Sequence, residues 1–151
     1  MPGLGVPLEG EDKLPPLVLL LTVSKIHYRV GTDGAVCGFD IRLSGHHVAL
    51  EAAHIKWHQA GGPSTEANGL ALCTLHHKLF DRGTFTLSES RRVTVSEHTH
   101  GTIGFNEWLM AFHGKPIRSP QRPTYVADTQ FINWHVREVF RGPSRYAEDV
   151  T

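Results

Sequence analysis

The chain has 151 residues, of which 40% are hydrophobic and 20% are charged, and its 15 basic residues balance its 15 acidic ones. These values fit one soluble globular domain and exclude a protein that binds nucleic acid through overall positive charge. The apolar run 17–23 is too short to span a bilayer, and the acidic residues before it argue against a signal peptide. Two cysteines far apart do not make a disulfide framework, which favours a cytoplasmic location.

The predicted organisation of the chain changes near residue 33. Residues 1–33 are expected to form an N-terminal extension of unclear structure, because 1–13 are rich in Gly, Pro and acid while 17–30 contain β-forming residues. The elements expected next are a turn at 31–34, a short strand within 37–43, a turn at 44–45 and a strand at 48–55.

The middle of the chain predicts a loop, a short strand and a helix. Gly61-Gly62-Pro63-Ser64 is a strong turn signal, and Asn68-Gly69 is a tight-turn dipeptide before a short apolar run. A helix can begin at Cys73 or Thr74 and should end at Gly83. On that helix His77 and Asp81 are four residues apart, so they should share a face.

The last third predicts a β-hairpin followed by two helices. The hairpin pairs 84–87 with 92–96, and the first helix spans 105–112 with Trp108, Leu109 and Phe112 on one face. An extended, proline-containing connector follows at 115–127. Asp128 can cap a last helix over 129–140, whose apolar stripe consists of Ile132, Val136, Val139 and Phe140. The fold class expected is therefore α+β.

Three polar residues stand at fixed intervals within apolar surroundings. Asn68 follows His54 by fourteen residues, and His77 follows Asn68 by nine. A strand, a loop, a second strand and a helix would bring the three side chains around one cavity. A histidine can act as a general base because its ordinary pKa lies near neutrality, and it is also a common metal ligand. An isolated histidine on an apolar strand is usually a buried structural residue, but the spacing favours a site.

This stretch resembles the HNH, or ββα-metal, endonuclease motif, and most closely the HNH domain of McrA-like, modification-dependent restriction endonucleases, including those acting on phosphorothioate DNA. The runs that carry the resemblance are Glu51–Pro63, Asn68–Cys73 and His76–Gly83, and the similarity covers about residues 34–142. The resemblance implies an HNH domain over 34–145, flanked by the extension 1–33 and a tail at 146–151. It also implies a ββα-metal core with a flanking β-hairpin and C-terminal helices.

The resemblance implies a role for each residue of the motif. His54 would be the general base, Asn68 would orient it, and His77 would bind a catalytic divalent metal such as Mg²⁺ or Mn²⁺. In many HNH nucleases an Asp directly before the base completes the metal site, but here that position is Ala53. Asp81 is the best substitute, although it is equally well explained as a structural carboxylate pairing with Arg82. Glu51 and His58 are weaker candidates.

A second set of residues suggests structural zinc. Cys73 and His76 open the helix, and Cys37 lies upstream. Related domains have a fourth ligand where this chain has Gly34, so three ligands remain unless His46 or His47 supplies another. The alternative is two buried cysteines and a polar helix histidine.

The substrate implied is double-stranded DNA, phosphorothioated or methylated, with a separate modification-reading domain or a homodimer as partner and no membrane. Candidate phosphate contacts are Lys56, Lys78, Arg82, Arg91, Arg92, Arg118 and Arg122, although an ordinary surface role is the better explanation for any single one of them. Two other functions stay open. One is a catalytically weakened HNH-fold module that binds DNA, which Ala53 and Gly34 favour, and the other is a non-nuclease metal protein.

Overall fold

Residues 33–145 are described in the computed structural model of the chain. The expected extended segment 17–30 and the expected tail 146–151 lie outside the described residues. Within the described part, the strands pair as three separate antiparallel ribbons. These are β1 (Arg42–Leu43) with β2 (His46–His47), β3 (Leu50–His54) with β4 (Gly69–Cys73), and β5 (Phe85–Leu87) with β6 (Val93–Val95).

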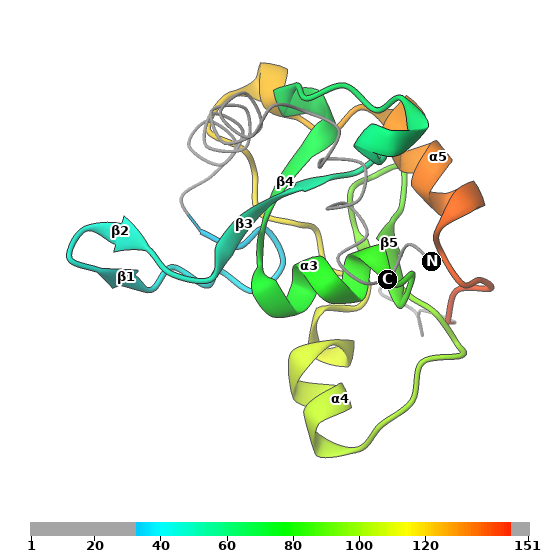
Figure 1. Cartoon of the computed structure of the whole chain (residues 1–151). Coiled ribbons are helices and arrows are strands. Elements are labelled where there is room, and N and C mark those ends of the chain that lie inside the picture. The colour runs from blue at the N-terminus through cyan, green and yellow to red at the C-terminus, as the bar shows by residue number, and fades with distance from the viewer. Residues whose placement is uncertain (1–32, 146–151) are drawn as a thin grey trace.

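The predicted ββα unit is confirmed as β3, β4 and helix α3 (Thr74–Asp81), which lies beside the two strands (Figure 1). Register pairs Leu50 with Cys73 and His54 with Gly69, so the strand observed is shorter than the 48–55 expected. The helix begins at Thr74 and is capped by Cys73, whose sulfur accepts a hydrogen bond from the amide of His76.

Gly83 explains why α3 ends where it does. Its φ is +76°, and a Cβ there would lie 2.2 Å from the carbonyl oxygen of Val139. A residue with a side chain would therefore clash with backbone as well as suffer the strain of a left-handed conformation. The close approach also brings the end of the chain's last helix against the end of α3.

One main hydrophobic core joins the ββα unit to the ribbon β5–β6 and to helix α5 (Thr129–Glu138). Residues from strands β3 to β6 and from α3 and α5 contribute to it, and the largest are Ile55, Leu72, Phe80, Phe85, Leu87 and Ile132. Asp128 caps α5 as predicted, because its carboxylate accepts a hydrogen bond from the amide of Gln130. The core thus fixes α3 against the rest of the described chain.

Two predicted helices differ in detail from those observed. Helix α5 ends at Glu138 rather than 140, and its buried side chains are Ile132 and His135, while Val136 is 40% exposed. The expected helix 105–112 is helix α4 (Ile103–Trp108) followed by a 3₁₀ turn, η3 (Met110–Phe112). Trp108 is 54% exposed whereas Leu109 is buried, so the two do not share a buried face as expected.

His135 is buried in place of the expected Val136 because its polar atoms find partners inside the protein. Its Nε2–H donates to the carbonyl of Phe80 at 3.0 Å, and its Nδ1 accepts from the hydroxyl of Thr86 at 2.7 Å. The ring also stacks on that of Phe80, with centroids 3.8 Å apart. Burial lowers the pKa of His135 to about 3, so the ring is neutral in the folded protein.

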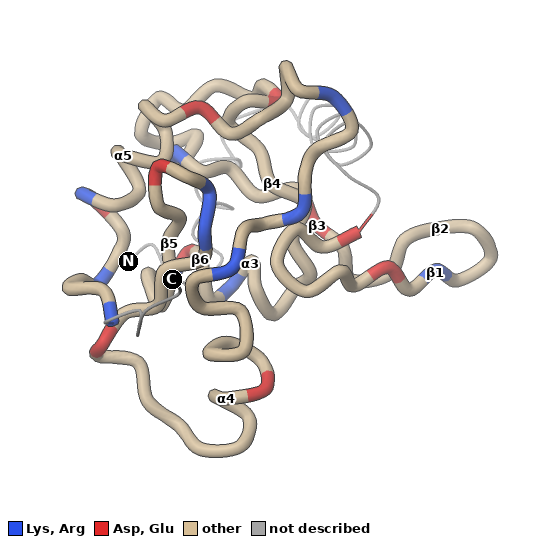
Figure 2. The backbone as a smooth tube through the Cα atoms, turned by 180° about the vertical axis from the view of Figure 1, so that it is seen from behind, with Lys and Arg blue, Asp and Glu red and all other residues tan. Residues whose placement is uncertain are grey.

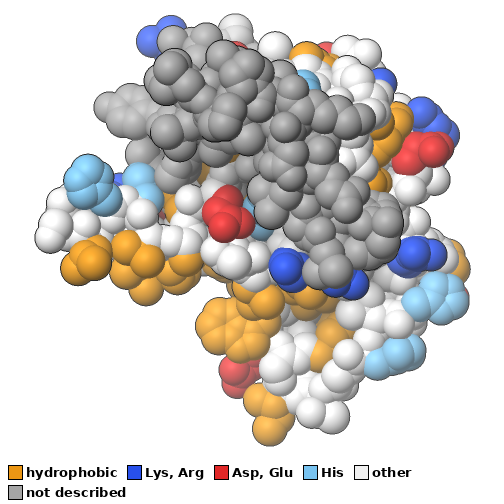
Figure 3. Space-filling view, in the orientation of Figure 1, with side chains coloured by type: hydrophobic (Ala, Val, Ile, Leu, Met, Phe, Trp, Pro, Cys, Tyr) orange, Lys and Arg blue, Asp and Glu red, His pale blue; other side chains and the backbone are white. Residues whose placement is uncertain are grey.

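The loops contain three more short 3₁₀ turns. These are η1 (His58–Ala60) and η2 (Glu66–Asn68) between β3 and β4, and η4 (Pro123–Tyr125) within the expected extended connector 115–127. The ribbon β1–β2 projects from the body (Figure 1), and exposed apolar side chains lie on and near it and around α4 (Figure 3). They include Ile41, Leu43, Leu75, Ile103 and Trp108. Among residues 33–145, no helix combines the length and apolar character that a bilayer crossing requires.

Candidate active site and metal-ligand cluster

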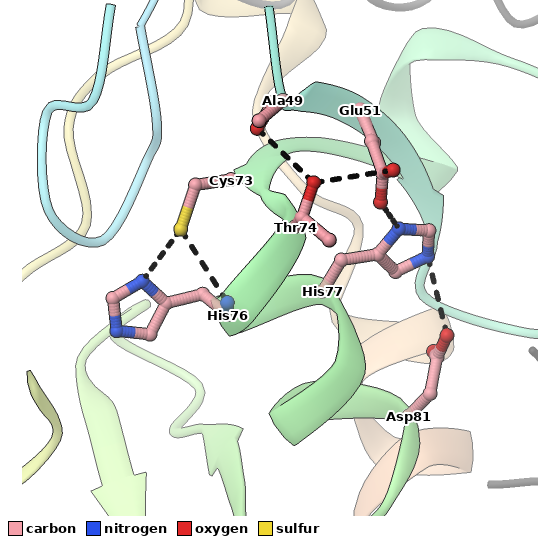
Figure 4. A network of polar contacts seen from close by, with 7 residues as sticks. All are labelled: Ala49, Glu51, Cys73, Thr74, His76, His77 and Asp81. Atoms are coloured by element: carbon pink, nitrogen blue, oxygen red, sulfur yellow. Dashed lines mark hydrogen bonds and ion pairs between the residues drawn. The ribbon is translucent and has the colours of Figure 1, made fainter. Parts of the chain in front are cut away.

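Helix α3 carries two groups of polar residues in its first two turns (Figure 4). Cys73 and His76 point to one side, where their side chains meet. Thr74 and His77 point toward Glu51 of β3. Because residues three apart on a helix share a face, the sequence Cys-Thr-Leu-His-His produces these two pairs from one turn.

His77 lies between two carboxylates. Its Nδ1 is 2.7 Å from Oε1 of Glu51, and its Nε2 is 3.2 Å from Oδ2 of Asp81. Burial alone lowers the pKa of His77, but the hydrogen bonds and negative charges of Asp81 and Glu51 outweigh it and raise the pKa to about 9. The hydrogen bond with His77 in turn lowers the pKa of Glu51. Asp81 is thus where the sequence placed it, beside His77.

Glu51 is better placed to share a metal with His77 than the sequence suggested. It is two residues from Ala53 on β3, so both side chains lie on the same face of the strand. Ala53 is 1% exposed and belongs to the core, where an Asp would be a buried carboxylate. The Glu51 side chain is part-exposed, reaches His77 and accepts a hydrogen bond from the hydroxyl of Thr74 at 3.3 Å. A carboxylate is therefore available on the strand without any change at Ala53.

His54 ends β3 and is buried, with 2% of its surface exposed. Its Nε2 lies 2.9 Å from the hydroxyl of Ser64, and its ring centroid is 6.0 Å from that of His58. The sequence did not single out Ser64, since one serine in a Gly/Pro turn carries no signal. That His54, Asn68 and His77 surround one cavity stays a prediction.

Asn68 has a different set of contacts from the expected hydrogen bond to His54. Its Oδ1 accepts from the amide of Lys56 at 2.8 Å, and its Nδ2 donates to the carbonyls of Lys56 and Pro63 at 2.9 and 2.8 Å. The residue is fully buried, and these three bonds use both amide hydrogens. Asn68 therefore holds the backbone of the β3–β4 loop together.

Cys37, Cys73 and His76 form the one group of three metal-ligating side chains found among the described residues, with all ligand atoms within 4.8 Å of one another. Two thiolates bound to one tetrahedral ion at about 2.3 Å would lie about 3.8 Å apart. The sulfurs of Cys37 and Cys73 are 3.8 Å apart, and Nδ1 of His76 is 3.2 Å from the sulfur of Cys73. The separation of the two sulfurs therefore suits a tetrahedral metal ion.

Hydrogen bonds around this cluster favour the protonation states in which His76 and Cys73 can bind a metal. His76 Nε2–H donates to the carbonyl of Trp108 at 2.7 Å, so its Nδ1 faces the sulfurs without a proton. The hydrogen bond shared by the two cysteines lowers the pKa of Cys73 to about 6 and raises that of Cys37 to about 12. A Cβ on Gly34 would lie 3.5 Å from the sulfur of Cys37, so Gly34 lies beside the cluster but provides no ligand.

The positions of Lys and Arg fall on several segments of the described backbone, as do those of Asp and Glu (Figure 2). Several of the candidate phosphate contacts already have protein partners. Arg91 donates to the carbonyls of Glu89 and Ala127, and Arg92 donates to that of Gly114. Arg118 pairs with Asp33 at 3.6 Å. Lys78 and Arg82 are exposed on or next to α3, beside His77 and Asp81, and are the better placed of the candidates.

Comparison with known proteins agrees with this geometry. Residues 35–88 match the HNH endonuclease family model, and that range contains the whole ββα unit. A solved structure of the modification-dependent TagI restriction endonuclease matches with a TM-score of 0.54 and 24% identity, over 79% of this chain and 37% of that one. This chain therefore spans little more than a third of that enzyme's length. None of the curated proteins compared with the sequence matches it. Residues 35–88 thus match the HNH endonuclease family, and the chain has the α+β fold expected from its sequence, similar in fold to a modification-dependent restriction enzyme.

Proposed function

We propose that this domain hydrolyses phosphodiester bonds of double-stranded DNA with the help of a divalent metal, as the cleavage part of a restriction system directed at modified DNA. The observation that supports it best is the arrangement of His77, held between Glu51 and Asp81 on the helix of an HNH unit whose first strand ends in His54. An imidazole and a carboxylate side by side are the donor set that a catalytic divalent metal takes in proteins.

In the proposed reaction His54 takes a proton from the attacking water. The water oxygen forms a bond to phosphorus, the bond from phosphorus to the 3′ oxygen breaks, and that oxygen leaves with a proton drawn from solvent. A bound divalent metal would neutralise charge on the phosphate and the leaving oxygen. Removal of a general base typically slows such a step by about a hundred- to ten-thousand-fold.

The residues around His77 would hold such a metal in place of a ring proton, which the raised pKa of about 9 otherwise keeps bound at neutral pH. The two carboxylates lie on opposite nitrogens of the ring, so only one of them can share an ion with the nitrogen beside it. The other carboxylate would then accept a hydrogen bond from the remaining ring N–H and fix the orientation of the ring, as carboxylates hydrogen-bonded to metal-bound histidines do. Glu51 is the candidate ligand because its side chain is 43% exposed, whereas Asp81 is 4% exposed. Asp81, the substitute expected from sequence, becomes the orienting partner.

We also propose that the cluster of Cys37, Cys73 and His76 holds a structural Zn²⁺. Two sulfurs and one imidazole nitrogen are the ligands of structural zinc sites, and the sulfur separation of 3.8 Å suits a tetrahedral ion. The cluster would link the segment around Cys37 to the start of α3. Since the same helix turn carries His77, zinc would stabilise the position of the proposed catalytic histidine.

The proposal of modified DNA as substrate draws on the similarity in fold to a modification-dependent enzyme of which this chain spans 37%. Recognition of phosphorothioate or methyl groups is proposed to lie with a further domain or a partner chain, with a homodimer as the simplest assembly. Lys78 and Arg82 would contact DNA phosphates, which position the duplex without reading its sequence.

The test is nicking of plasmid DNA, unmodified, methylated and phosphorothioated, with Mg²⁺ or Mn²⁺. Cleavage by the wild-type chain should be lost in His54→Ala and in His77→Ala, while DNA binding and folding persist. Glu51→Gln should weaken Mn²⁺ binding measured by calorimetry more than Asp81→Asn does. Binding of DNA without cleavage under every combination would instead identify the chain as an HNH-fold DNA-binding module.

A further inference from the structure

The loop between β3 and β4 brings a hydroxyl group to the ring of His54. Ser64 Oγ lies 2.9 Å from His54 Nε2, a normal length for a hydrogen bond between a hydroxyl and an imidazole. Ser64 is half-buried and His54 is buried, so water competes little for this contact. Asn68 was the expected partner of His54, but its side-chain amide forms hydrogen bonds with the backbone of Lys56 and Pro63 instead.

The two residues directly before Ser64 are held in place. Asn68 Nδ2 donates to the carbonyl of Pro63, the residue directly before Ser64, at 2.8 Å. Gly62 packs on the backbone of Lys56, where a Cβ would meet the carbonyl oxygen at 1.9 Å, and its amide donates to the carbonyl of Trp57. These contacts fix the backbone before Ser64, and the hydrogen bond to His54 then orients the Ser64 hydroxyl.

We propose that Ser64 is the positioning residue of His54, and that Asn68 acts on His54 only by holding the loop that carries Ser64. The proposal rests on the proposed function in assigning His54 as the general base. Ser64 Oγ accepts the hydrogen bond from His54 Nε2–H, which leaves Nδ1 as the nitrogen that takes the proton from water. A neutral histidine carries a proton on only one of its nitrogens, and a hydrogen bond to one of them decides which.

The same contact serves the protonated ring. When Nδ1 has taken the proton, both ring nitrogens carry hydrogens, and Nε2–H still needs an acceptor in a site with little water. The lone pairs of Ser64 Oγ provide it without any movement of the loop. The ring of His58 lies nearby, with its centroid 6.0 Å from that of His54 and its plane tilted by 57°.

The first test does not depend on cleavage. In the full chain labelled with ¹⁵N-histidine, the His54 ring, assigned by its loss in His54→Gln, should show the Nε2–H form. Ser64→Ala should convert it to a mixture of the two neutral forms, and Ser64→Thr, which keeps the hydroxyl, should restore it. His135, locked by Thr86 and Phe80, provides an internal control whose signals should be the same in every folded variant. Should Ser64→Ala fail to fold, wild type and Ser64→Thr still decide the form of the ring.

The second test measures nicking of plasmid DNA. Ser64→Ala should lower kcat by about tenfold to a hundredfold through misorientation of the base, with KM changed by less than about threefold. Ser64→Thr should recover most of the rate. Signals and rates that are the same in Ser64→Ala as in wild type, or a wild-type His54 with its proton on Nδ1, would overturn the proposal. If wild type cuts no DNA, the proposed function fails, and the ring-nitrogen measurement alone decides the role of Ser64.

Discussion

Acid should destabilise this protein through one buried histidine, His135. The ring is fully buried, accepts from Thr86 and donates to the carbonyl of Phe80, and its pKa is lowered to about 3 by burial. In the unfolded chain the pKa returns to the ordinary value of 6.5. Because the folded pKa is the lower one, the unfolded state binds more protons between these values. The contribution to stability is therefore complete above pH 6.5 and is lost as pH falls toward 3.

The size of the effect follows from the two pKa values. A fully linked single proton changes the free energy of unfolding by about 1.4 kcal/mol per pH unit. Between pH 7 and pH 5 the unfolded histidine gains its proton while the folded one does not, which amounts to a loss of about 2 kcal/mol. That is a large part of the stability of an ordinary domain of this size.

The assay is urea unfolding at pH 7 and pH 5 in wild type and in the double variant His135→Phe with Thr86→Val. The variant keeps an aromatic ring on Phe80 and removes both the titrating group and the hydroxyl that it would leave unpaired. All other titrating groups, including the metal-ligand cluster, are common to both proteins, so the difference in pH dependence isolates His135. An equal loss of stability in the two proteins would refute the reasoning.

Three further outcomes are expected. Cys73→Ser should abolish the thiolate absorption bands of Co²⁺-substituted protein, and chelation of zinc from wild type should lower Tm, whereas an unchanged Tm counts against a structural metal. Lys78→Ala and Arg82→Ala should each weaken DNA binding about equally for all sequences and reduce the salt slope by about one, and an unaltered slope would exclude them as phosphate contacts. Gly62→Ala should cost about 1–3 kcal/mol by urea unfolding because its Cβ meets backbone, while Gly104→Ala in α4 has room and should cost less.

The sequence by itself determined the ββα unit. The apolar strand before His54 and the helix from Thr74 to the stop at Gly83 are local signals, and both are found close to where they were expected. The expected tight turn at Asn68-Gly69 is not formed, because Asn68 ends a 3₁₀ turn and Gly69 begins β4 in an extended conformation. Local spacing also placed Asp81 beside His77, since residues four apart share a helix face. The same holds for the cap at Asp128, which depends only on its neighbours in the chain.

Contacts between segments that are distant in the chain could not be predicted from the sequence. Hydrophobic periodicity predicted that Val136 would be buried in the core. His135 is buried instead, because Thr86 and Phe80, about fifty residues away in the sequence, form hydrogen bonds with both of its ring nitrogens. Burial of a polar ring depends on such partners, and a stripe of hydrophobic residues does not reveal them.

The tertiary structure also decided the details of the candidate site. Glu51 reaches His77 only because β3 lies beside α3, and Ala53 cannot be replaced simply by an acid because it faces the core. Asn68 was expected to touch His54 directly, yet it ties the loop backbone, and Ser64 makes the contact instead. Spacing along a chain fixes which residues can meet within one helix or strand. Which side chain makes the final contact with a site residue depends on the path of the loops, and that path is set by packing across the whole domain.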